Sequence, residues 1–94
     1  MQFQHQDDGQ QGEFFAVNEQ AQRIAEISYV WHGKDQVIAN HTWVDHSLRG
    51  QGVARQLLDV LVAFAREKNL KIVGTCSYVD VMFRRDKSLA DVVA

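Results

Sequence analysis

The sequence of 94 residues contains no proline and only one cysteine, Cys76. A single cysteine cannot form an internal disulfide, which excludes a disulfide-stabilised secreted miniprotein. The four histidines, at positions 5, 32, 41 and 46, lack the spacing of zinc ligands, and we expect no metal site. Because there is no apolar run of about 18 residues and no apolar leader, we expect neither a membrane span nor a signal peptide, and a cytoplasmic location.

The chain also lacks an excess of charge of one sign. It has 10 Lys and Arg, 12 Asp and Glu, and a formal net charge of -2. This balance gives no reason to expect nucleic acid or an anionic membrane as a partner. The length suits one domain spanning residues 1–94 and falls short of the ~200 residues common in two-domain enzymes. We expect a monomer or a weak dimer.

Short alternating segments in the N-terminal half predict strands. A stub at Met1–Gln6 and a polar loop at Asp7–Gly12 precede a β-like run over Glu13–Asn18. Arg23–Trp31 and Gln36–Val44 then alternate or carry β-branched and aromatic residues, with short turns between them. These three strands form an antiparallel meander.

The hydrophobic period changes to that of a helix over Gln51–Lys68, with Asn69 as a left-handed cap. Lys71–Cys76 is a further strand, which we expect to pair in parallel with the third strand because a helix separates them. Weaker helical patterns follow at Tyr78–Arg84 and Ser88–Val93. The predicted fold class is α/β (α+β), a single mixed sheet with a long crossover helix.

The segment Arg49-Gly50-Gln51-Gly52-Val53-Ala54 joins the third strand to this helix. Two glycines at a helix start leave backbone N–H groups free for an anion such as a phosphate, and Arg49 and Arg55 can add charge-assisted contacts. Alternatively, the glycines only permit a tight turn. The segment is neither a P-loop nor a dinucleotide-binding fingerprint, because the required Gly and Lys positions are not filled.

The turn resembles the acyl-CoA signature R/Q-x-x-G-x-G/A of the GCN5-related N-acetyltransferases, with Arg49, Gly52 and Ala54 at the defined positions. His41-Thr42-Trp43-Val44 resembles the HTxV strand of the small, single-domain branch of that family. Cys76 lies where that branch has a cysteine near the end of the next strand. The resemblance runs from about residue 23 to the C-terminus.

This resemblance implies that acetyl-CoA is the cosubstrate. In the family, the CoA pyrophosphate rests on backbone amides at the helix start, here Gln51–Ala54, and pantetheine passes between the two parallel strands where they diverge. The cofactor-binding residues expected on this basis are Arg49, Gly50, Gln51, Gly52, Val53, Ala54, Val44 and Arg55. Longer relatives cover the acceptor side with an N-terminal pair of helices that has no counterpart here, so we expect an open acceptor side.

Three side chains are candidates for catalysis. Cys76 can attack the thioester as a thiolate or protonate the departing CoA; alternatively, it is a small buried strand residue. His41 is the candidate general base, because imidazole exchanges protons near neutral pH, or else a strand histidine bonded to a neighbour. Tyr78 matches an acid that larger relatives carry on the helix after this strand, or it packs in the core. Diverging strands would let His41 and Cys76 face the same opening.

These inferences predict an N-acetyltransferase that moves an acetyl group from acetyl-CoA to a primary amine. The amine can belong to a protein lysine, a protein N-terminus or a small polyamine-like molecule. One alternative is a CoA-binding module with little or no transferase activity. The other is a structural or interaction domain in which the glycines serve only the turn.

Overall fold

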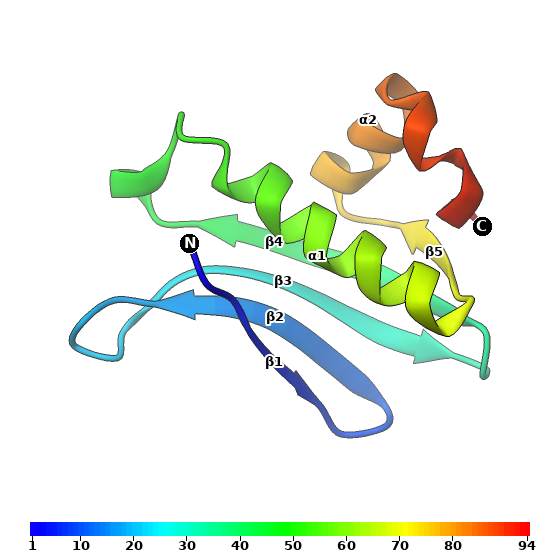
Figure 1. Ribbon diagram of the computed structural model, residues 1–94, viewed down its shortest axis with the longest axis horizontal. Helices are drawn as coiled ribbons and strands as arrows, with labels where there is room; N and C mark the ends of the chain where they lie inside the picture. Colours follow the sequence, from blue (N-terminus) through cyan, green and yellow to red (C-terminus); the bar gives the residue numbers. More distant parts are fainter.

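Five strands form one mixed sheet in the order β1-β2-β3-β4-β5 (Figure 1). The computed structural model describes residues 1–94 without a gap. Neighbouring strands are antiparallel from β1 to β4, and β5 is parallel to β4. The strands are β1 (Gln4–Asp7), β2 (Gln11–Val17), β3 (Arg23–His32), β4 (Gln36–Val44) and β5 (Lys71–Gly74). The predicted mixed sheet, with a parallel strand after a long helix, is confirmed.

The first strand, β1, lies where the sequence predicts a stub and a loop. All four of its residues are exposed, so it carries no apolar alternation that would reveal a strand. It pairs with β2, and its His5 ring stacks on Phe14 with 4.0 Å between ring centroids. His5 Nε2 also lies 2.7 Å from the buried Tyr29 hydroxyl. The antiparallel meander therefore has four strands, one more than predicted.

The helix α1 (Val53–Lys68) crosses one face of the sheet (Figure 1). Its apolar side packs on the buried residues of β3 and β4, including Ile27, Tyr29 and Val37, which are fully buried. The buried residues of α1 are Val53, Leu57, Leu58, Leu61, Val62 and Ala65. Asn69 ends the helix in the left-handed conformation, as predicted.

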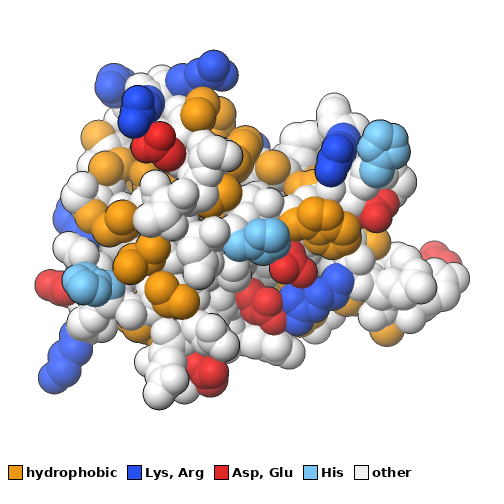
Figure 2. Space-filling view, turned by 180° about the vertical axis from the view of Figure 1, so that it is seen from behind, with side chains coloured by type: hydrophobic (Ala, Val, Ile, Leu, Met, Phe, Trp, Pro, Cys, Tyr) orange, Lys and Arg blue, Asp and Glu red, His pale blue; other side chains and the backbone are white.

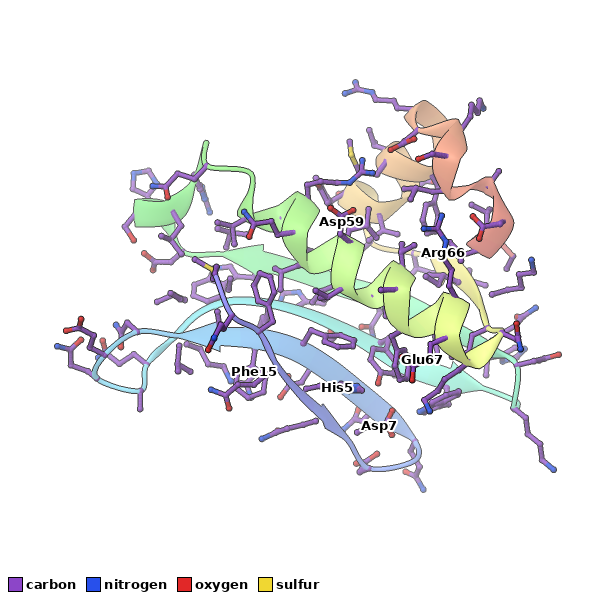
Figure 3. The ribbon with its side chains drawn as sticks, viewed as in Figure 1. His5, Asp7, Phe15, Asp59, Arg66 and Glu67 are labelled. Atoms are coloured by element: carbon purple, nitrogen blue, oxygen red, sulfur yellow. The ribbon has the colours of Figure 1, made fainter.

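A second helix, α2 (Ser77–Arg85), and a 3-10 helix, η2 (Lys87–Val92), follow β5. The strand β5 ends at Gly74, before the predicted end at Cys76, because Cys76 is already the N-cap residue of α2. Arg66 lies between α1 and the C-terminal segment (Figure 3) and pairs with Asp91 at 2.9 Å. This pair ties η2 to the long helix.

No helix covers the other face of the sheet, where histidine, acidic and basic side chains gather (Figure 2). None of the helices has the length and apolar composition needed to cross a membrane. No three His, Cys, Asp or Glu side chains lie together as a metal ion would require.

Candidate active site

The turn between β4 and α1 depends on two glycines in the left-handed region. Gly50 has a φ of 83° and Gly52, the residue before the first turn of α1, a φ of 76°. A Cβ added at either position would meet nothing within 4 Å. The backbone conformation, and not a lack of space, is therefore what favours glycine here.

The backbone N–H groups at the start of α1 are free. The first N–H of the helix with a partner is that of Gln56, which donates to the Gly52 carbonyl at 3.1 Å. None of the N–H groups from Gly50 through Arg55 donates to another group of the protein. These free donors coincide with the positive end of the helix dipole, an arrangement that can hold an anion.

A cavity of about 250 Å³ lies against this helix start. It brings together Tyr78 and every predicted cofactor residue except Gln51, whose side chain lies 3.4 Å from the Ser47 carbonyl. Leu48 also lines the cavity, although it is not among the residues predicted from the sequence. Its apolar side chain just before the Arg49 turn is the only sequence signal that could have indicated it. The lining residues are Val44, Leu48, Arg49, Gly50, Gly52, Val53, Ala54, Arg55 and Tyr78.

The two arginines predicted to bind the cofactor differ in whether they already form ion pairs with carboxylates of the protein. Arg55 forms ion pairs with Asp59 and Asp86, which raise the pKa of its guanidinium and neutralise its charge. Arg49 forms no ion pair, and its Nε lies 3.4 Å from the Val44 carbonyl oxygen. Arg49 is therefore the free cation at this cavity.

The parallel pairing of β4 with β5 stops halfway along β4, because β5 ends there. Their pairing ends at Ala39 and Gly74, although β4 continues to Val44. The N–H groups of Thr75 and Cys76 both donate to the Ala39 carbonyl at 3.1 Å, and the chain then turns into α2. The last part of β4 consequently has no strand neighbour on the β5 side.

A β-bulge in β4 sets which side chains face which side of the sheet. Asn40 has no partner on β3, because Ala39 pairs with Tyr29 and His41 pairs with Ser28. His41 thus points to the uncovered face, where its side chain is 51% exposed and Nε2 lies 3.3 Å from a carboxylate oxygen of Glu26. The structure does not bring His41 and Cys76 to one face of the sheet.

The half-buried Cys76 contacts Thr42, which the bulge turns toward the helix-covered face. Cys76 Sγ lies 3.4 Å from the Thr42 hydroxyl oxygen, across the gap between β4 and α2. Burial raises the pKa of the Cys76 thiol, but the nearby Thr42 hydroxyl and the backbone N–H groups of Val79 and Tyr78 outweigh it and lower that pKa below its ordinary value. Such a thiol is more readily ionised than an ordinary one.

Tyr78 lies in the first turn of α2 and lines the cavity at the start of α1. Partial burial raises the pKa of its phenol, and nearby Asp59 adds to the rise while Arg55 opposes it. At neutral pH Tyr78 is therefore protonated and can donate a proton.

A second concavity, of about 340 Å³, lies on the uncovered face and reaches from the β1–β2 hairpin to the bulge. Asn40, next to His41, lines its end, and the Ser28 hydroxyl donates to the Asn40 side-chain oxygen at 2.9 Å. No residue predicted for the cofactor lines this concavity. The two cavities lie on opposite faces of the sheet.

Comparison with known proteins identifies relatives of this arrangement. A Staphylococcus aureus protein described as GCN5-like and solved by NMR superimposes with a TM-score of 0.79 and 32% identity, covering 99% of this chain and 87% of that one. Protein NATD1 of Xenopus tropicalis is 36% identical over 55 residues, which are 58% of this chain and 50% of that protein, so the match spans about half its length.

The fold is also that of larger proteins. YhbS, a GNAT family N-acetyltransferase of Escherichia coli solved in complex with CoA, gives a TM-score of 0.67 at 22% identity, covering 83% of this chain and 46% of that one. Residues 13–92 match the sequence family of the GCN5-related N-acetyl-transferases, which is most of the chain. The chain thus belongs to the GCN5-related N-acetyltransferase family.

Proposed function

We propose that this protein binds acetyl-CoA at the start of α1 and transfers its acetyl group to a primary amine. The observation that carries the proposal is the row of free backbone N–H groups from Gly50 through Arg55, which borders a cavity beside the unpaired Arg49. Phosphate is the ligand that such a helix start recognises best. Family membership and the CoA complex of the structurally similar YhbS support the same ligand.

The early end of β5, which leaves the last part of β4 without a strand neighbour, supports a path for the pantetheine arm. From the helix start, the gap beside the last part of β4 leads toward Thr42 and Cys76, and Tyr78 borders the same cavity. The unpaired edge of β4 can hydrogen bond to the amides of the arm. The thioester then lies close to Cys76 and Tyr78.

Acetyl transfer forms a carbon–nitrogen bond to the amine and breaks the carbon–sulfur bond of the thioester. The departing CoA thiolate needs a proton, and the protonated phenol of Tyr78, which lines the same cavity, can donate it. The amine must lose a proton, and we assign its removal to His41. Its exposed position on the uncovered face means that the acceptor approaches from that face, opposite the helices.

Calorimetric titration with acetyl-CoA tests the binding site. In Arg49→Ala we expect about tenfold weaker binding, equivalent to ~1.4 kcal/mol, because one charge-assisted contact to phosphate is lost. Lys34→Ala is the matched control, since it removes one exposed positive charge from the turn between β3 and β4. Equal affinities of Arg49→Ala and the wild type, or an equal loss in Lys34→Ala, would contradict the site.

To test for acetyl transfer, the protein is incubated with acetyl-CoA and each of a panel of amines, and the release of free CoA is measured. Tyr78→Phe should lower kcat by roughly 10²-fold, the lower range for a lost general acid, and leave the acetyl-CoA affinity unchanged. His41→Asn should lower kcat by a similar factor, with the loss smaller at high pH where the amine loses its proton unaided. If a variant retains the wild-type kcat, the residue replaced in that variant has no part in the mechanism.

One observation favours a second candidate, a CoA-binding module without transferase activity. His41 lies on the opposite face of β4 from Thr42 and Cys76, so the candidate base is separated from the other candidate groups. The same assays distinguish the two functions. Saturable acetyl-CoA binding without CoA release in any amine supports the module, whereas turnover with one amine supports the transferase.

A further inference from the structure

Thr42 and Cys76 are far apart in the sequence but meet at the gap between β4 and α2. The distance from Cys76 Sγ to the Thr42 hydroxyl oxygen is 3.4 Å, within the range of a sulfur hydrogen bond. The bulge at Asn40 makes this contact possible. Without the extra residue, strict alternation would turn Thr42 to the uncovered face and His41 toward the helices.

Cys76 is the residue that precedes α2, and its side chain accepts no capping hydrogen bond from the first turn of that helix. The Cys76 carbonyl accepts from the N–H of Asp80 at 3.0 Å, which fixes the first turn of the helix around it. The Thr42 hydroxyl is therefore the one hydrogen-bond partner of the Cys76 sulfur.

We propose that Thr42 is a positioning residue for Cys76, and that its hydroxyl holds the sulfur as a thiolate in the gap between β4 and α2. In the neutral state the thiol donates to the Thr42 oxygen. When the thiol proton passes to water, the hydroxyl rotates and donates its own proton to the sulfur anion. The inference rests on the proposed transfer function and deepens it.

The contact with Thr42 favours the nucleophilic role of Cys76. A hydroxyl that donates to the sulfur stabilises the thiolate, which is the nucleophilic form. The thiolate forms a bond to the acetyl carbon, the bond from that carbon to the CoA sulfur breaks, and the CoA thiolate takes a proton from Tyr78. The amine then attacks the acetyl-cysteine, a carbon–nitrogen bond forms and the carbon–sulfur bond to Cys76 breaks, which restores the thiolate. The proton of the amine passes to water, and water returns a proton to Tyr78.

The test uses the fact that Cys76 is the only cysteine of the chain. The rate of alkylation by iodoacetamide across a pH series therefore reports the thiolate fraction of this residue alone. Thr42→Val keeps the shape and removes the hydroxyl, and we expect three- to tenfold slower alkylation at pH 7 with the midpoint shifted to higher pH. Thr42→Ser restores the hydroxyl and should return both values close to those of the wild type.

Thr75→Val is the matched control. Its hydroxyl lies next to Cys76 in the chain but is directed to the Ala39 carbonyl, at 3.4 Å, so its loss should leave the alkylation profile unchanged. Of the titratable neighbours, Tyr78 stays protonated over this range, Asp80 pairs with Arg84, and His41 lies on the other face of β4. An unchanged profile in Thr42→Val, or a Thr42→Ser variant as slow as Thr42→Val, would overturn the proposal.

Acetyl-CoA supplies the second readout. Intact mass after incubation with acetyl-CoA should show one added acetyl group at Cys76, which accumulates three- to tenfold more slowly in Thr42→Val at equal acetyl-CoA affinity. Equal rates of acetylation would overturn the role of Thr42. Loss of acetyl-CoA binding in the wild type would instead refute the proposed function, and the alkylation series would still decide whether Thr42 holds the thiolate.

Discussion

The close packing of α2 on β5 makes Gly74 a sensitive position. An alanine Cβ at position 74 would lie 2.9 Å from Val79 Cγ1 and 3.2 Å from the backbone nitrogen of Asp80. Val79 is fully buried, and as a β-branched residue in a helix it has little rotamer freedom to move away. Overpacking of this kind costs about 1–3 kcal/mol. The lower chain entropy of unfolded alanine offsets roughly 0.4–1 kcal/mol. We therefore expect Gly74→Ala to lower the free energy of unfolding by about 1–2 kcal/mol.

A double-mutant cycle identifies the cause. Val79→Ala removes the Cγ1 atom that the new methyl group would meet, at a cost of about 2 kcal/mol from lost burial. If the clash is responsible, the double variant Gly74→Ala with Val79→Ala should be more stable than the sum of the single effects by at least ~0.5 kcal/mol. Urea denaturation followed by circular dichroism measures all four proteins. Strictly additive effects, or a Gly74→Ala variant as stable as the wild type, would refute the packing argument.

Two further predictions concern the hairpin and the C-terminal segment. In Gly12→Ala the new Cβ would lie 2.3 Å from the hydroxyl oxygen of the fully buried Tyr29, so thermal melting should show a loss of about 2 kcal/mol or more; a normal melting temperature would contradict this geometry. Hydrogen bonds from Ser88 and Arg55 lower the pKa of Asp86 to about 2 from its ordinary 3.8. A carboxylate with a lowered pKa stabilises the fold above its unfolded pKa and loses this effect as pH falls, so stability should decline between pH ~4 and ~2. Asp86→Asn should flatten that decline in melting temperatures measured across the range, and an equally steep decline would assign it to other groups.

The elements with strong periodicity were predictable from the sequence. The strand β4 has the predicted bounds, Gln36–Val44, because its residues are β-branched and aromatic and turns flank it. The helix α1 was predicted with its last residue, Lys68, from its apolar stripe. By contrast, β1 is polar and wholly exposed, so its pairing with β2 comes from backbone hydrogen bonds and from the contacts of His5. Periodicity carries no information about such a strand.

The candidate site was predictable in its cofactor half and not in its catalytic half. The turn residues are neighbours in the sequence, so their convergence on one cavity follows from local structure. The faces occupied by His41 and Thr42 depend instead on the bulge, which reverses the alternation after Ala39. Two adjacent polar residues, Asn40 and His41, interrupt the apolar alternation and are the only sequence signal of that bulge. Without knowledge of the bulge, the contact of Thr42 with Cys76 could not be predicted from the sequence.

The most direct test of the account is an NMR titration of the isotope-labelled protein with acetyl-CoA. If acetyl-CoA binds at the start of α1, the backbone amide signals from Gly50 through Arg55 should shift saturably, with smaller shifts at Val44 and Tyr78. Signals around Glu13, on the uncovered face, should stay unchanged on addition of the ligand alone. The absence of saturable shifts at millimolar acetyl-CoA, or shifts confined to the uncovered face, would contradict binding at the start of α1.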